Sequence, residues 1–199
     1  EEFSYNGVVG RRTAARGFLP APAYVGGETV QETGGGVCQG SSTVYLAALR
    51  SNLEIVERYP HGYITRYVPD GMDATVYYGA KDFRFRNNTP FPIQVVGSVS
   101  GRSLTVSILG TKSDNITVEM TNQTVGTTGY KTVYKVDSSL PAGSTRVSVT
   151  PYAGYTVKVY RNLYENGKLK DTKLESTSVY RSRDKVVLVS PEDAAQYGL

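Results

Sequence analysis

Three consecutive glycines run into an almost uninterrupted apolar stretch, and this combination limits the fold more than any other feature of the chain. Gly34-Gly35-Gly36 allows positive φ angles and a close approach of the backbone to a neighbouring segment. The run Val44–Leu49 is rich in helix-forming residues, so we expect a helix over about residues 39–51. Because this helix would be apolar on nearly every side, it is predicted to lie buried at the centre of its domain.

The composition favours strands and turns for the remainder of the chain. Its 199 residues include 21 Gly, 9 Pro and 16 Tyr but no Trp, which is unusual for a bundle of helices. The net charge is +4 with scattered Lys and Arg residues, which disfavours nucleic acid as a partner and suits an anionic cell wall or membrane surface. No stretch is apolar over the thickness of a bilayer. The chain starts at Glu1 without Met, so we expect part of a longer protein, and a membrane anchor could lie upstream.

Alternating and β-branched residues predict mainly strands after the helix. Residues 1–30, whose glycines include Gly26 and Gly27, are expected to form loops and short extended pieces. A turn at Asn166-Gly167 is expected to join two long strands. The predicted strands are 53–57, 63–68, 74–78, 83–86, a hairpin of 93–99 and 103–109 around Gly101, and then 116–120, 130–136, 146–150, 155–164, 168–178 and 185–189.

The polar segment 110–114 breaks this pattern and is expected to separate two domains. Residues 1–110 would form a mixed, β-rich catalytic domain around one central buried helix. Residues 111–199 would form an all-β C-terminal domain. The predicted fold class is therefore α+β.

Cys38 is the only cysteine, and it lies directly after the glycine run at or near the start of the predicted helix. A lone cysteine is usually a small buried apolar residue. The glycines favour a nucleophile instead, because they permit close approach of a substrate and can aim backbone N–H groups at an oxyanion. The helix N-terminus would also favour the thiolate. Both interpretations stay open on these residues alone.

A thiol nucleophile usually works with a base, and His61 is the only histidine. We expect His61 at the start of a strand that follows the helix. Asp73 is the first candidate to orient its imidazole, since it precedes a neighbouring predicted strand. Asp70, Asp82 and Asn87 are alternatives, although each suits a turn.

Metal and cofactor chemistry is disfavoured. One Cys and one His do not make a structural zinc site, and the carboxylates are dispersed. Gly34-Gly35-Gly36 is not followed by a suitably placed Lys or Arg, so it does not resemble a phosphate-binding loop.

The segment Gly34–Thr43, with Tyr45, Ala47-Ala48, residues 53–58, His61, residues 67–76 and residues 82–88, resembles the VanW domain. The resemblance covers about residues 1–110. Gly40 departs from it, because the family more often has an apolar residue such as Val there. Residues 115–190 are similar to a G5 domain through Pro141-Ala142-Gly143, residues 151–160 and Asn166-Gly167-Lys168.

The resemblance implies an extracellular protein of a Gram-positive bacterium, in the cell wall or anchored to the outer face of the membrane. It also implies a cysteine-dependent L,D-transpeptidase that joins peptidoglycan stem peptides by 3-3 cross-links. Cys38 would be the nucleophile, His61 the proton donor and Asp73 its orienting group. The candidates for the oxyanion and the substrate are Gly35, Gly36, Gln39, Ser41 and Arg66, the last of which would pair with a substrate carboxylate.

Two alternatives remain from the sequence. Water could open the thioester, which would give a wall endopeptidase or carboxypeptidase. The chain could instead bind wall glycan without catalysis, with Cys38 in a structural role. In that case the C-terminal domain would offer tyrosines as stacking surfaces. The candidates are Tyr152, Tyr155, Tyr160, Tyr164 and Tyr180.

Overall fold

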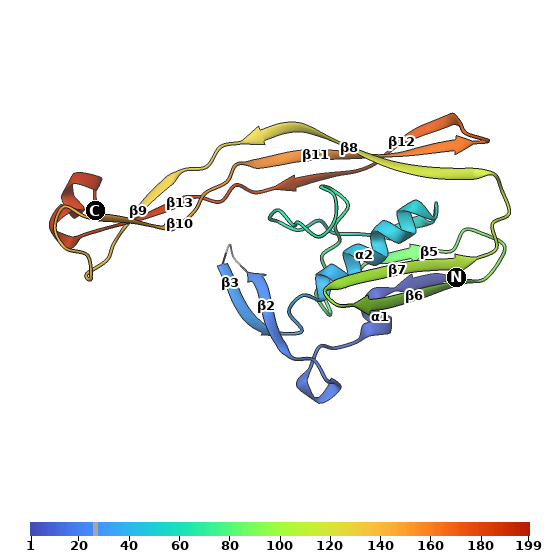
Figure 1. The fold of residues 1–199 in the computed structure, drawn as a ribbon, viewed down its shortest axis with the longest axis horizontal. Helices are drawn as coiled ribbons and strands as arrows, with labels where there is room; N and C mark the ends of the chain where they lie inside the picture. Colours follow the sequence, from blue (N-terminus) through green and yellow to red (C-terminus); the bar gives the residue numbers. More distant parts are fainter. Residues whose placement is uncertain (26–27) are drawn as a thin grey trace. The chain divides into compact units, whose positions relative to one another are not determined.

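The computed structural model describes residues 1–25 and 28–199, so Gly26 and Gly27 lie outside the described residues. The chain is rich in strands and has few helices (Figure 1), in agreement with the predicted α+β class. Its contacts form two compact units. The first contains residues 1–61, 65–123 and 157–178, and the second contains 62–64, 124–156 and 179–199. The division into residues 1–110 and 111–199 stays a prediction, and the observed grouping is not linear along the chain.

The N-terminal segment contains more regular structure than the sequence predicts. β1 (Glu2–Ser4) leads into α1 (Tyr5–Val9) and η1 (Ala14–Arg16), and β2 (Pro20–Val25) pairs antiparallel with β3 (Glu28–Thr33). β2 and β3 are short extended pieces, as expected, but the sequence did not predict α1 or the pairing of the two strands. The prolines of β2 argue against a strand in the sequence, because proline has no backbone N–H to donate. A two-stranded ribbon tolerates them, since each strand has a free edge where no N–H is needed.

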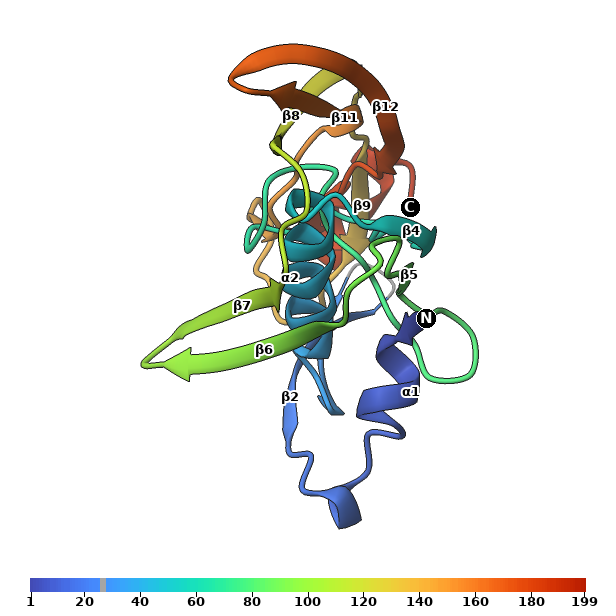
Figure 2. The same ribbon diagram turned by 90° about the vertical axis from the view of Figure 1, so that its right-hand side faces the viewer.

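Helix α2 (Val37–Arg50) is the predicted central helix, begun two residues earlier. Its N-cap Gly36 and the nearby Gly34 both have φ of +81°, a conformation that favours glycine. Tyr45, Ala48 and Leu49 are fully or almost fully buried. The helix contacts β4 (Glu54–Glu57) and β7 (Ser103–Gly110), and Figure 2 shows it lying against β7. The early start places Cys38 in the first turn.

Two small sheets flank this helix within the first unit. β5 (Arg84–Arg86) lies between β1 and β4 in an antiparallel sheet. β6 (Ile93–Ser100) and β7 form the predicted hairpin, and Gly101 at its turn has φ of +59°. These findings confirm the strands predicted near residues 53–57, 83–86, 93–99 and 103–109.

The segment between β4 and β5 contradicts the predicted strands 63–68 and 74–78. Residues 63–68 form no strand, and residues 74–78 contribute only an isolated bridge between Tyr77 and Lys81. Side chains hold this segment in place of a strand ladder. Ser42 Oγ accepts a hydrogen bond from Ala74 N–H at 2.9 Å, and Asp73 Oδ2 accepts one from His61 N–H at 2.7 Å. Such bonds satisfy the backbone without a neighbouring strand.

The C-terminal half consists of strands, as predicted. β8 (Ile116–Thr128), β11 (Gly154–Glu165) and β12 (Lys168–Tyr180) form one sheet in the order β12-β11-β8. Asn166 and Gly167, with φ of +50° and +77°, make the predicted turn between β11 and β12. A second sheet has the order β10-β13-β9, and η2 (Pro191–Tyr197) ends the chain. Its strands are β9 (Thr132–Val136), β10 (Thr145–Val149) and β13 (Lys185–Val189).

The core of the first unit collects residues from distant parts of the chain. Tyr45 and Phe83 meet edge to face at 5.3 Å between ring centroids. Val157 and Val159 of β11 lie against Gly71, where a Cβ atom would come within 2.5 Å of Val159. β11 thus contributes to the packing of the segment that carries Asp73. No helix of the described residues is long and apolar enough to cross a membrane.

Candidate active site

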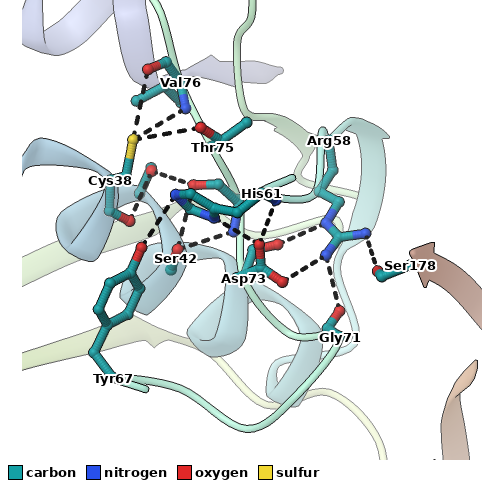
Figure 3. A network of polar contacts seen from close by, with 12 residues as sticks. Cys38, Ser42, Arg58, His61, Tyr67, Gly71, Asp73, Thr75, Val76 and Ser178 are labelled. Atoms are coloured by element: carbon teal, nitrogen blue, oxygen red, sulfur yellow. Dashed lines mark hydrogen bonds and ion pairs between the residues drawn. The ribbon is translucent and has the colours of Figure 1, made fainter. Parts of the chain in front are cut away.

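The Cys38 thiol lies at the first turn of α2, facing the segment that follows Asp73 (Figure 3). It is a free, partly exposed cysteine. Val76 N–H donates to Sγ at 3.5 Å, and the Val76 carbonyl oxygen and Thr75 Oγ1 each lie 3.6 Å from it. The sulfur therefore has polar partners, which a cysteine that serves only as apolar packing does not need.

His61 meets Asp73 through two separate hydrogen bonds. The ring nitrogen Nδ1 lies 2.6 Å from Asp73 Oδ2, and the backbone N–H of His61 donates to the same oxygen at 2.7 Å. The other ring nitrogen, Nε2, lies 3.2 Å from the hydroxyl of Tyr67. His61 also interacts with the Cys38 thiol, and this interaction lowers the pKa of the thiol and raises the pKa of the imidazole. The structure thus brings together Cys38, His61 and Asp73, although His61 lies in a loop and not at the predicted strand start.

Arg58 fixes Asp73 from the side opposite His61, and the sequence reasoning gave it no role. Its Nη2 lies 3.1 Å from Asp73 Oδ1 and 3.0 Å from the Gly71 carbonyl oxygen, and its Nε donates to the Asp73 carbonyl oxygen at 2.6 Å. The remaining nitrogen, Nη1, donates to Ser178 Oγ at 2.8 Å, and the guanidinium lies over the Tyr45 ring. Asp73 is completely buried. A buried carboxylate needs a charged partner, and that requirement was the available signal for an arginine such as Arg58.

The electrostatics of the site favour a charged Cys38–His61 pair. Burial opposes the imidazolium, but the hydrogen bond with Asp73 and the interactions with Cys38 outweigh it and raise the pKa of His61 to about 9. Burial likewise opposes the thiolate, but hydrogen bonds with His61, the Val76 amide and Thr75 lower the pKa of Cys38 overall. Each shift thus favours the charged form of its group, and a thiolate beside an imidazolium is the reactive form of a thiol nucleophile.

Some of the predicted oxyanion donors already donate their N–H to a backbone carbonyl, and others do not. Gly35 N–H donates to the Glu32 carbonyl at 2.9 Å, and Gln39 N–H donates to the Gly36 carbonyl at 3.0 Å. Among the described residues, no group accepts a hydrogen bond from the N–H of Cys38 or Gly36. The unoccupied amides at the helix start are thus those of Gly36 and Cys38, and the Gln39 side chain is exposed.

Gly35 and Ser41 have structural roles in the fold, and their predicted oxyanion and substrate roles stay predictions. A Cβ atom at Gly35 would lie 2.1 Å from the Ala21 carbonyl oxygen, so glycine lets β2 pass close to the turn. Ser41 is completely buried, and its hydroxyl donates to the Ala74 carbonyl at 2.6 Å. It ties α2 to the Asp73 segment.

The other sequence candidates are exposed or have hydrogen-bond partners other than the imidazole. Arg66 is exposed. Asp82 accepts hydrogen bonds from Ser4 and from the backbone of Asn6, and Asn87 stabilises a turn through Thr89. The Asp70 carbonyl accepts from Asn122. Within the described residues, no group of three or more His, Cys, Asp or Glu side chains could hold a metal ion.

Comparisons with known proteins give matches for two separate segments of the chain. Residues 1–109 match the family described as VanW like protein, and residues 116–191 match the G5 domain. The uncharacterized protein YoaR of Bacillus subtilis (strain 168) is 45% identical over 108 residues, which are 54% of this chain and 36% of YoaR. The chain therefore matches little more than a third of that relative's length.

Two solved G5 structures are similar to part of the chain. The crystal structure of HP0197-G5 is 24% identical, covers 38% of this chain and 97% of its own, and has a TM-score of 0.22. The IgA1 protease G5 domain is 16% identical, covers 39% of this chain and 94% of its own, and has a TM-score of 0.27. Cys38, His61 and Asp73 all fall within the other match, residues 1–109.

Proposed function

Because the chain belongs to the VanW family, and a VanW domain followed by a G5 domain indicates a protein associated with the cell wall, we propose that it is a cysteine L,D-transpeptidase. It acts outside the cell, on the wall of a Gram-positive bacterium. Its substrates are peptidoglycan stem peptides, which it joins by 3-3 cross-links. The observation that carries the proposal is the Cys38 thiol at a helix start, next to an imidazole whose Nδ1 is bound by buried Asp73.

In the first step the Cys38 thiolate attacks the carbonyl carbon between stem residue 3 and D-Ala 4. The N–H of Cys38 is available to bind the oxyanion that forms. His61 then transfers its Nε2 proton to the D-Ala nitrogen as the C–N bond breaks. The products are free D-Ala and a thioester on Cys38, and His61 is left neutral.

In the second step the side-chain amine of another stem attacks the thioester carbonyl. Neutral His61 accepts a proton from this amine, and the C–S bond breaks to regenerate the thiolate and the imidazolium. Asp73 holds Nδ1 throughout, so Nε2 is the nitrogen that exchanges protons in both steps. The balance of protons is restored after each cycle without a cofactor.

The G5 domain is proposed to hold the enzyme on wall glycan. The tyrosines of the C-terminal half are its candidate stacking groups, and of these Tyr180 is almost completely buried. That burial favours packing for Tyr180 and leaves the other tyrosines as candidates.

Incubation with a disaccharide-tetrapeptide tests the reaction directly. Mass spectrometry should find tetrapeptide–tripeptide dimers and free D-Ala with the wild type and neither with Cys38→Ala. Thr43→Ala is a matched control on the same helix, because the Thr43 hydroxyl bonds only the Gln39 carbonyl among the described residues. Monomers shortened by D-Ala would instead establish hydrolysis, and unchanged substrate would leave a binding protein.

A further inference from the structure

We propose that Tyr67 binds the reacting amine, first the leaving nitrogen of D-Ala and then the nitrogen of the acceptor stem. Tyr67 would thereby make the site selective for amide donors and amine acceptors. This inference rests on the proposed transpeptidase function. It assigns the phenol a part in substrate recognition beyond the Cys38, His61 and Asp73 set.

The Tyr67 hydroxyl lies next to the ring nitrogen of His61 that exchanges protons. Asp73 occupies His61 Nδ1 at 2.6 Å, so every proton transfer must use Nε2. The Tyr67 hydroxyl oxygen lies 3.2 Å from Nε2. A nitrogen that exchanges a proton with Nε2 must itself come within about 3 Å of it, which places that nitrogen next to the phenol.

The Tyr67 side chain packs against His61, and part of the residue borders solvent. Figure 3 shows the Tyr67 hydroxyl directed at the His61 ring, whereas the Cys38 thiol is joined to Thr75 and Val76. The Tyr67 ring meets the His61 ring nearly edge to face, at 6.1 Å between centroids and an angle of 78°. Tyr67 as a whole is 39% exposed, so the residue borders solvent where a peptide would enter.

The phenol can accept a hydrogen bond but does not act as a base. Burial, and then the charges of Cys38 and Asp73, raise the pKa of Tyr67, although a hydrogen bond with Ser42 acts against them. The neutral phenol oxygen retains lone pairs for one N–H of an amine. As D-Ala leaves, its nitrogen keeps one N–H for Tyr67 while it gains the proton of His61. The attacking amine presents one N–H to His61 and another to Tyr67.

An ester donor separates this role from simple support of His61. If oxygen replaces the nitrogen of the scissile bond, the leaving group has no N–H for Tyr67. Cys38 attack and protonation by His61 remain the same. Loss of the Tyr67 hydroxyl should therefore slow the release of an amine more than the release of an alcohol.

The test compares release of D-Ala from the amide with release of the hydroxy acid from the matching ester. Tyr67→Phe should lower the amide rate about tenfold, the effect of one lost hydrogen bond, and leave the ester rate within about twofold. Tyr77→Phe is the matched control, because Tyr77 lies in the same loop and is 64% exposed. A thermal melt and the alkylation rate of Cys38 establish that Tyr67→Phe keeps the fold and the thiolate.

Each other outcome overturns the proposal in a recognisable way. Equal losses on amide and ester would make Tyr67 a positioning residue for His61. Unchanged rates on both would remove Tyr67 from the reaction. If the wild type releases neither product in a Cys38-dependent manner, the proposed transpeptidase function fails together with this inference. The wild type is therefore tested first, before any Tyr67 variant is made.

Discussion

Replacement of Asp73 by Asn should shift the titration of the only histidine in the chain. Burial lowers the pKa of His61, but the hydrogen bond with Asp73 is the largest of the effects that act against burial and raise this pKa to about 9. The amide of the Asp73→Asn variant would keep an oxygen for Arg58 but lose the negative charge. The pKa of His61 in Asp73→Asn should therefore fall towards or below its ordinary value of 6.5.

The size of the effect follows from the two pKa values. The difference between 6.5 and about 9 corresponds to about 3 kcal/mol in favour of the imidazolium in the folded protein. Because the pKa of His61 is raised on folding, this contribution is complete below pH 6.5 and is lost as the pH rises through about 9. Asp73→Asn should remove most of it, since Cys38 supplies only the remainder.

Nuclear magnetic resonance can measure this titration without assignment, because the chain has one histidine. The imidazole C–H signals should move with a midpoint near pH 9 in the wild type and at least about one pH unit lower in Asp73→Asn. Asp82→Asn is the matched control, because Asp82 also accepts hydrogen bonds but binds Ser4 and Asn6. A wild-type midpoint near 6.5, or equal midpoints in the wild type and Asp73→Asn, would refute the reasoning.

Three further predictions concern the same network. Cys38→Ala should make the free energy of unfolding fall as the pH rises above 6.5, by at most about 1.4 kcal/mol per pH unit. In the wild type the lowered pKa of Cys38 opposes this trend, because the folded thiol loses its proton at a lower pH than the unfolded thiol. Urea unfolding of the wild type should therefore show a smaller slope, and a similar slope in both proteins would contradict this. His61→Ala should slow iodoacetamide alkylation of Cys38 at about pH 7 by about tenfold or more, because an ordinary thiol is only about 3% ionised there; equal rates in the folded proteins, with denatured samples as the control, would show that His61 does not assist the thiol. Arg58→Ala should lower the free energy of unfolding by about 3–5 kcal/mol, as expected for a buried ion pair that loses one partner. Arg66→Ala should change it by no more than about 0.5 kcal/mol. Thermal and urea unfolding measure both variants, and equal effects would contradict the role of Arg58 as the partner that holds Asp73.

Local signals in the sequence were sufficient for the central helix and most strands. The apolar run after Thr43 predicted α2, and Asn166-Gly167 predicted the β11–β12 turn, because periodicity and turn chemistry act over a few residues. One cysteine and one histidine directed the prediction to Cys38 and His61. Asp73 was the first of several candidates because it precedes residues 74–78, which form an isolated bridge and not the predicted strand.

The remaining features depend on contacts between distant residues. β-branched residues in 63–68 and 74–78 suggested strands, but side chains such as Ser42 and Arg58 satisfy that backbone instead. Gly35 looked like part of an oxyanion site, yet its lack of a side chain is explained by the approach of β2. No local pattern encodes either contact.

The bond from Arg58 to Ser178 joins residues 120 positions apart. The anchor of Asp73 is therefore incomplete in a growing chain until residue 178 has been synthesised and β12 has formed. Contacts of such long range also form late, because a large loop must close first. The order of synthesis thus delays the fully supported Cys38–His61 pair until the C-terminal strands are present.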